Sequence, residues 1–201
     1  DAFGIGAPAR REVWKEPVGV VGVITPWNFP LEIILNKIGP ILAMGNTMVL
    51  KPAPDTPWNA TRIGRIIAEQ TDIPPGVINI VTSSDHLVGE VLSTSPLVDM
   101  VAFTGSTATG RRIMTAAAQT IKPTFLELGG KSVYLILEDD GNISGAVGGS
   151  AFISMHAGQG CAMPTRLLVP HSRYDEAVEL VVAGEAVDDV VQLGPDRFGD
   201  E

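Results

Sequence analysis

Short apolar runs alternate with longer segments of helical period over most of the chain. The pattern predicts strands at residues 18–25, 47–51, 77–81 and 100–104, and helices at residues 31–44, 57–70, 86–92 and 108–119. Ser84 or Asp85 is the expected N-cap of the third helix. The strands are apolar throughout instead of alternating, which is typical of parallel strands covered on both faces. The predicted fold class is therefore α/β, with a doubly wound parallel sheet of the Rossmann-like kind that binds nucleotides.

A second, shorter α/β block follows the first. It is predicted to contain strands at residues 124–128, 133–137 and 166–169, and a helix of small residues from about 142 to 155. Residues 183–201 combine weak periodicity with many acidic side chains, so no element is predicted there. We expect two domains, a cofactor-binding domain over residues 1–127 and a partial catalytic domain over residues 128–201.

Composition and charge narrow the classes of function. Hydrophobic residues make up 45% of the 201 residues and charged ones 18%, which is typical of a folded domain with a buried core. The net charge of −9 comes mostly from the end of the chain, since the residues from Asp175 onward hold nine of the 23 acids and one of the 14 bases. The chain has neither a basic stripe nor an apolar run of membrane-spanning length. We therefore expect a soluble, cytoplasmic protein without a nucleic-acid or membrane partner.

The chain has one cysteine, Cys161, which excludes an internal disulfide and a cysteine-rich zinc site. The three histidines are far apart in sequence, so no metal is expected. A single cysteine is more often an inert buried side chain than a nucleophile. Here the small residues Ala157, Gly158 and Gly160 precede it, and glycines let a backbone approach a ligand closely. Cys161 is therefore a candidate nucleophile.

Glu127 is the second candidate for chemistry. It lies inside the apolar run 124–128, just before two glycines. A carboxylate in such a run is unfavourable unless it faces a cavity or a partner. Two interpretations remain open. In the structural one Glu127 pairs with Lys131 or marks a solvated strand end, and in the catalytic one it is a partly desolvated general base.

Two loops at predicted strand ends add polar groups. Residues 103–110 place two glycines and several hydroxyls at a helix N-terminus, where free N–H groups and the dipole attract anions. The usual Gly-x-Gly-x-x-Gly fingerprint is absent, and a capped tight turn explains the same residues. Residues 25–30 hold Asn28 between two aromatics and two prolines. Its amide is available to a developing negative charge, or the loop is only a structural turn.

Taken together, these motifs resemble the aldehyde dehydrogenase superfamily of NAD(P)-dependent enzymes. The resemblance covers about residues 12–180 and rests on five motifs in a fixed order, Thr25–Pro30, Lys51–Ala53, Phe103–Ser106, Leu126–Lys131 and Gly158–Cys161. It implies oxidation of an aldehyde to a carboxylic acid, with NAD as cofactor and NADP as the second choice. A relative that passes the acyl group to coenzyme A and a truncated, non-catalytic nucleotide-binding module are the alternatives.

The resemblance also implies roles for individual residues. Cys161 would attack the aldehyde carbon, the Asn28 amide would hold the oxyanion, and Glu127 would activate the water that hydrolyses the thioester. Lys51 would contact the adenine ribose and Ser106 the pyrophosphate. The cofactor-binding residues expected on this basis are Ile24, Thr25, Pro26, Trp27, Lys51, Ala53, Pro54, Gly89, Phe103, Thr104, Gly105, Ser106, Thr109, Leu128 and Gly129.

The sequence departs from the family pattern in two respects. Pro54 stands where many members have an acidic residue that grips both ribose hydroxyls, with Asp55 next to it, and this leaves NAD and NADP open. Family enzymes are also much longer, and a homo-oligomer is expected of the full-length form. The chain is therefore expected to be a fragment or a truncated form that shows little turnover by itself.

Overall fold

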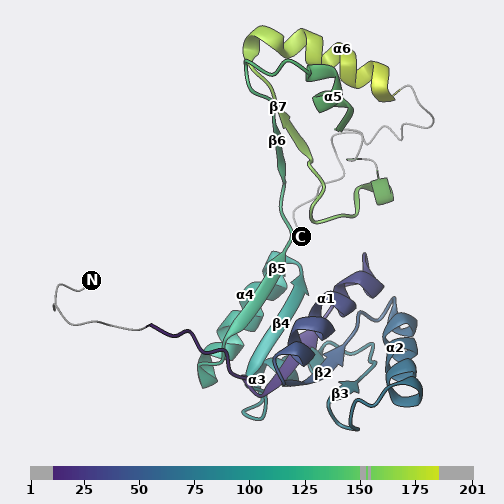
Figure 1. Cartoon of the computed structure of the whole chain (residues 1–201), viewed down its shortest axis with the longest axis vertical. Helices are drawn as coiled ribbons and strands as arrows, with labels where there is room; N and C mark the ends of the chain where they lie inside the picture. The colour runs from purple at the N-terminus through teal and green to yellow at the C-terminus, as the bar shows by residue number, and fades with distance from the viewer. Residues whose placement is uncertain (1–10, 150–152, 154, 186–201) are drawn as a thin grey trace, which may run out of the picture. The chain divides into compact units, whose positions relative to one another are not determined.

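The computed structural model describes residues 11–149, 153 and 155–185, and the chain divides into two compact units (Figure 1). Unit 1 runs to Leu128 and unit 2 begins at Gly129. Unit 1 is built on a five-stranded sheet and unit 2 on a two-stranded one. Residues 186–201, for which the sequence predicts no element, lie outside the described residues.

The sheet of unit 1 is parallel throughout, with the strand order β3-β2-β1-β4-β5. Its strands are β1 (Val20–Ile24), β2 (Thr47–Lys51), β3 (Ile78–Ile80), β4 (Met100–Gly105) and β5 (Thr124–Leu128). The chain moves outward from β1 to β3 and then returns to the other side of β1, so the order reverses between β1 and β4. Ligands of open α/β sheets bind at the carboxyl ends of the strands at such a switch point. The predicted α/β class is confirmed.

Helices cover both faces of this sheet (Figure 1). The helices are α1 (Pro30–Ala43) and α2 (Pro57–Gln70) on one face, and α3 (Leu87–Thr94) and α4 (Thr107–Ala117) on the other. Alternate side chains of β4 enter the two cores, Ala102 under α1 and α2, and Val101 and Phe103 under α3 and α4. Full burial of a Val, Ile or Phe side chain contributes about 1.5–3 kcal/mol, so the two cores hold the helices on the sheet.

The helix ends follow local signals in the sequence. Pro30 and Pro57 lie in the first turns of α1 and α2, where a missing N–H has no consequence. The expected N-cap of α3 was wrong, because His86 is the N-cap and forms no capping hydrogen bond with its side chain. Asp85 forms a turn just before the helix, in which its Oδ1 accepts a hydrogen bond from Leu87 N at 2.9 Å. α4 is shorter than the predicted helix 108–119, because its last residues tighten into a 3₁₀ turn, Ala118–Thr120. None of the described helices has the length and apolar character needed to cross a membrane.

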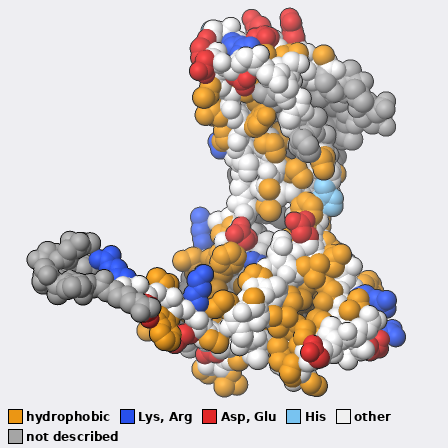
Figure 2. Space-filling view, viewed as in Figure 1, with side chains coloured by type: hydrophobic (Ala, Val, Ile, Leu, Met, Phe, Trp, Pro, Cys, Tyr) orange, Lys and Arg blue, Asp and Glu red, His pale blue; other side chains and the backbone are white. Residues whose placement is uncertain are grey.

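The surface of unit 1 carries many apolar side chains on the face that α1 and α2 form (Figure 2). Large exposed examples at the start of α1 are Trp27, Leu31 and Leu35, with exposed fractions of 48–50%. Apolar side chains that gather on a surface are typical of regions that contact other protein or a ligand.

Unit 2 has the parallel strands β6 (Val133–Leu135) and β7 (Arg166–Leu168), with α5 (Ile143–Gly148) and α6 (Tyr174–Glu185). The predicted helix 142–155 is wrong in length, because α5 ends at Gly148 and residues 155–158 form a 3₁₀ segment that contains left-handed residues. Residues 150–152 and 154 of that prediction lie outside the described residues. α6 was not predicted.

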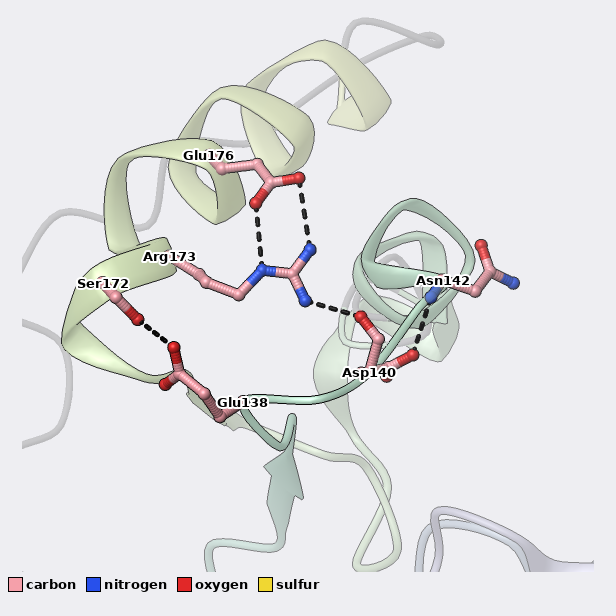
Figure 3. Close-up of polar contacts among 6 residues, drawn as sticks. All are labelled: Glu138, Asp140, Asn142, Ser172, Arg173 and Glu176. Carbon is pink, nitrogen blue, oxygen red and sulfur yellow. Dashed lines mark hydrogen bonds and ion pairs between the residues drawn. The ribbon is translucent and has the colours of Figure 1, made fainter.

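Arg173 links the loop that precedes α5 to the first turn of α6 (Figure 3). Its guanidinium donates to the Glu176 carboxylate at 3.1 and 3.3 Å and to the Asp140 carbonyl at 2.6 Å. The Ser172 hydroxyl donates to Glu138 at 2.6 Å. The hydrogen bond to Glu176 raises the pKa of Arg173 above its ordinary value. These contacts join the segment that follows β6 to the segment that follows β7.

Candidate nucleotide-binding and catalytic site

The predicted cofactor-binding residues of unit 1 lie mostly at the carboxyl ends of the strands. Thr25, Pro26 and Trp27 follow β1, while Ala53 and Pro54 follow β2. Phe103, Thr104 and Gly105 end β4, Ser106 and Thr109 begin α4, Leu128 ends β5, and Gly89 lies in α3. Gly129 is the first residue of unit 2. The topology therefore brings most of the predicted set to one edge of the sheet.

A pocket of about 770 Å³ opens between α3 and α4. Four predicted residues line it, Ile24, Lys51, Gly89 and Thr109. Its other lining residues were not predicted, and they are His86, Glu90, Ser93, Thr94, Arg111, Arg112, Ile113, Thr115, Ala116 and Gln119. Most of these recur at helical spacing along α3 and α4, so the period of each helix was the signal that could have found them.

Lys51 is the buried cation of this pocket. Its exposed fraction is 4%, and its Nζ donates to the Pro52 carbonyl at 3.4 Å. Burial lowers the pKa of Lys51, and the charge of Asp85 partly offsets that effect. The stem of Lys51 passes close to Gly89, where a Cβ would lie 3.9 Å from Lys51 Cδ. A small residue in α3 therefore leaves room beside the lysine.

The N-terminus of α4 is capped by its own hydroxyls. Ser106 Oγ accepts a hydrogen bond from Thr109 N at 3.2 Å and donates one to Thr109 Oγ1 at 3.0 Å. The capped turn that was one interpretation of this motif is thus present, and the contact of Ser106 with pyrophosphate remains a prediction. No acidic residue occupies the first turn of α4, so the positive end of its dipole is available to an anion.

A row of polar side chains lies at the carboxyl ends of β1, β4 and β5, on the face of the sheet that α1 covers. Thr25 and Thr104 have exposed fractions of 3% and 7%, and neither hydroxyl has a hydrogen-bond partner. The register pairs Thr104 with Glu127 on β5. Glu127 is exposed on this edge strand, which favours the solvated strand end among the two interpretations that the sequence left open. An unpaired buried hydroxyl costs about 1–3 kcal/mol, and such groups mark places that a ligand or water completes.

Lys37 of α1 was not predicted, and it lies near Glu127. Its exposed fraction is 8%, and its Nζ lies 4.3 Å from the centre of the Phe125 ring. Burial lowers the pKa of Lys37, and the negative charge of Glu127 partly offsets that shift. The signal was available in the sequence, because Lys37 shares the buried helical face of Ile34, Ile38 and Ile41.

Cys161 is exposed and follows an unusual stretch of backbone. His156, Ala157 and Gly158 have φ angles of 55°, 54° and 73°. A non-glycine residue in this left-handed region costs about 1–2 kcal/mol, and such strain gathers at functional sites. The Ser132 hydroxyl donates to the Cys161 carbonyl at 3.5 Å. A smaller pocket of about 400 Å³ lies next to this segment, with Ala162 and Met163 in its wall.

Asn28 is half-buried in the loop after β1. Asn28 and Glu127 belong to unit 1 and Cys161 to unit 2, so their convergence on one carbonyl remains a prediction. Within the residues that the structure describes, no three His, Cys, Asp or Glu side chains are grouped to hold a metal ion.

The sheet with its switch point, the pocket and the buried lysine are typical of α/β proteins that bind nucleotides. The family model for the aldehyde dehydrogenase family matches residues 7–195, and the chain belongs to that family.

Relatives and solved structures agree with this. The 3-succinoylsemialdehyde-pyridine dehydrogenase of Pseudomonas sp. is 43% identical over 190 residues, which are 91% of this chain and 40% of the relative. The succinate-semialdehyde dehydrogenase (NADP(+)) GabD of Escherichia coli strain K12 is 42% identical over 200 residues, 96% of this chain and 41% of the relative. A mutant aldehyde dehydrogenase C from Pseudomonas syringae, solved with NAD+ and octanal, is 38% identical with a TM-score of 0.80 and covers 86% of this chain and 35% of that chain. The chain spans about two fifths of the length of these curated relatives.

Proposed function

We propose that the protein oxidises an aldehyde to a carboxylic acid, with NAD(P) as the hydride acceptor. The observation that carries this proposal is the family match, which spans both the pocket of unit 1 and Cys161 of unit 2. A relative named as an NADP(+) semialdehyde dehydrogenase, and a solved relative with NAD+ and octanal, support the substrate class and the cofactor.

The donor set of unit 1 fits a dinucleotide. The pocket between α3 and α4 has the size and apolar walls for an adenosine, with Lys51 at its floor to meet the ribose. The N-terminus of α4 would hold the pyrophosphate. The hydroxyls of Thr25 and Thr104 would form hydrogen bonds with polar groups of the cofactor beyond the pyrophosphate. When bound, the nicotinamide ring supplies the acceptor for a hydride.

The chain's own residues would carry out the acyl chemistry. The thiolate of Cys161 attacks the carbonyl carbon, which forms a C–S bond and moves an electron pair to the oxygen. The Asn28 amide and the backbone N–H of Cys161 donate to that oxyanion. Loss of the hydride leaves a thioester. Glu127 then takes a proton from water, whose oxygen attacks the thioester carbon and expels the thiolate.

Lys37 would act on this chemistry through Glu127. The buried Lys37 ammonium and the Glu127 carboxylate attract each other, and this attraction would hold the carboxylate in one orientation. The burial of Lys37 under Phe125 keeps the ammonium in place. Lys37 is therefore proposed as a positioning residue for the base and not as a catalytic one.

The substitution Glu127→Gln tests this function. We expect one burst of reduced cofactor per Cys161, followed by a steady-state rate about 100-fold lower, because thioester hydrolysis has lost its base. Mass spectrometry should detect the acyl group on Cys161. The matched control is Glu69→Gln, which changes an exposed carboxylate on α2 that pairs with Arg65. An unchanged steady-state rate in the Glu127 variant would refute the assigned role.

The same measurement separates the alternatives. A relative that passes the acyl group to coenzyme A needs no water-activating base, so its turnover with coenzyme A would survive the loss of Glu127. A non-catalytic module would give no burst, and its Cys161 would react with a thiol probe no faster than free cysteine. We further propose a homo-oligomer for the full-length form and a reducing compartment such as the cytoplasm, where the nucleophile stays a thiol.

A further inference from the structure

An ion pair between Glu90 and Arg112 crosses the pocket between α3 and α4. Both residues belong to the pocket lining, Glu90 on the α3 wall and Arg112 on the α4 wall. The Arg112 guanidinium donates a hydrogen bond to the Glu90 carboxylate, so the pair bridges the two walls. The side chains of Arg112 and Glu90 are 72% and 48% exposed, which places the bridge on the solvent side of the pocket.

Hydroxyl groups in the same walls form hydrogen bonds within their own helices. Ser93, Thr94 and Thr115 each donate to the carbonyl four residues earlier, at 2.8, 2.8 and 3.0 Å. Each of these hydrogen bonds stays within one helical turn and adds nothing across the pocket. Of these five polar wall residues, Glu90 and Arg112 are the two that reach from one helix to the other.

The other charges at the pocket belong to Lys51, Asp85 and Arg111. Lys51 is buried, and the charge of Asp85 acts on it. Arg111 is exposed in the lining, and its positive charge cannot replace Glu90 as the partner of Arg112. Removal of the Glu90 charge therefore makes the pocket more positive as well as breaking the bridge. An uncharged ligand separates these two effects.

We infer that the Glu90–Arg112 bridge is a clasp that must open before the adenine ring of a cofactor enters between α3 and α4. The inference rests on the proposed function, since it takes the pocket to hold the adenosine end of the cofactor. Gly89 and Thr109, which line the pocket next to the bridge, have small side chains, so the space behind the clasp can take a flat ring. An exposed ion pair is weak, so the clasp opens readily. The closed fraction lowers the apparent affinity, and salt that screens the pair favours opening.

Calorimetric titration with adenosine at low and high salt tests the clasp without any turnover. Adenosine carries no charge, so salt does not screen an attraction between ligand and protein. Glu90→Gln should tighten adenosine binding about 1.5- to fivefold at low salt, because the pair no longer closes the pocket. Between about 0.01 M and 1 M salt the wild type should gain a similar factor, and the variant should gain much less.

Two further variants show whether the effect belongs to the pair. In an Arg112→Gln background, Glu90→Gln should change adenosine binding no further, because its partner is already absent. The matched control is Glu69→Gln, which removes the same charge from an exposed ion pair with Arg65 on α2, outside the pocket lining. Glu69→Gln should leave the affinity for adenosine unchanged at both salt concentrations.

The outcomes separate the clasp from the proposed cofactor pocket. If the wild type binds adenosine and Glu90→Gln binds it equally or more weakly, the clasp is wrong while the pocket stands. A Glu90→Gln effect of the same size with and without Arg112 also overturns the clasp, because that effect would not depend on the pair. If neither the wild type nor any variant binds adenosine, the proposed pocket itself is wrong, and the clasp fails with it.

Discussion

Gly105 is the position where one added methyl group should affect both stability and binding. It ends β4, directly before the N-cap of α4. A Cβ at this position would lie 2.5 Å from Cζ of Phe103, 2.9 Å from Cε2 and 3.3 Å from Cε1. The Phe103 ring is 5% exposed in the core under α3 and α4, so it has no free space to move into. Gly105→Ala therefore forces an overpacked core.

The magnitude follows from the packing. Extra methyl groups in a well-packed core cost about 1–3 kcal/mol. With a urea dependence of about 1–3 kcal/mol per molar for a small domain, the unfolding midpoint of unit 1 should fall by about 1 M. Ile24 and Ile113 pack in or against the same core as Phe103 and also line the pocket, so 5′-AMP binding should weaken as well.

Tryptophan fluorescence during urea unfolding measures this change in unit 1, because all three tryptophans precede Leu128. Gly89→Ala in α3 is the matched control. Its Cβ would meet Ile24 Cδ1 at 3.5 Å and Lys51 Cδ at 3.9 Å, which are ordinary contacts. Alanine in a helix interior is favoured over glycine by about 0.5–1 kcal/mol, so the midpoint should rise while AMP binding still weakens. A midpoint of the Gly105 variant at or above that of the wild type would refute the packing argument.

Two further substitutions test the polar groups under α1. Lys37→Met should leave the free energy of unfolding unchanged or higher at neutral pH, because a buried ammonium is replaced by an apolar chain, while thioester hydrolysis slows. The pKa of Lys37 is lowered in the folded state from its ordinary value of 10.5. The unfolded chain therefore binds more protons between the two pKa values, and the wild type should gain stability as the pH rises through this range. Urea unfolding at several pH values should show that the variant lacks this gain. Thr104→Val should raise the free energy of unfolding by about 1 kcal/mol, since the unpaired hydroxyl is removed, and should weaken binding of NAD but not of AMP. Lower stability of Thr104→Val would contradict the assignment of an unpaired hydroxyl.

The fold of unit 1 could be predicted from the sequence because each of its elements has its own local signal. The runs 47–51 and 124–128 are strands with the predicted bounds, and the helix 57–70 begins at its proline as predicted. Apolar strands joined by helices also fix the parallel, doubly wound arrangement, since both faces of each strand must be covered. The end of α4 could not be predicted, because the change to a 3₁₀ turn depends on the left-handed Ile121 that follows it.

Unit 2 was less predictable because its sequence signals are ambiguous. The run of glycine, alanine and serine after Asn142 is compatible with a long helix, but small residues bury little apolar area, and α5 ends after six residues. α6 begins at Tyr174 and has Asp175 and Glu176 in its first turn, where acidic side chains interact favourably with the helix dipole. The many acidic residues around it made its apolar face hard to recognise in the sequence. The structure identifies the apolar face of α6, because Ala177 packs in the core with Ile136 and Ile143.

The residues of the candidate site also differ in how well the sequence predicts them. Loop residues such as Asn28, Ser106 and Cys161 were selected because motifs of unusual composition mark them. The pocket walls were not, since Glu90 and Arg112 belong to ordinary amphipathic helices, and their meeting depends on how α3 and α4 pack.

Thr25, Thr104 and Glu127 show why register matters more than sequence distance at this site. The pairing of Ile24 with Phe103 and of Thr104 with Glu127 places the three side chains on adjacent strands and on one face. Each residue alone has a structural explanation as a strand end. Side by side, the two buried hydroxyls without partners and the buried Lys37 ammonium destabilise the free protein, and the charge of Glu127 offsets only part of that cost. A sheet edge of this kind is specialised for what binds there, and the stability of unit 1 comes from the apolar cores on its two faces.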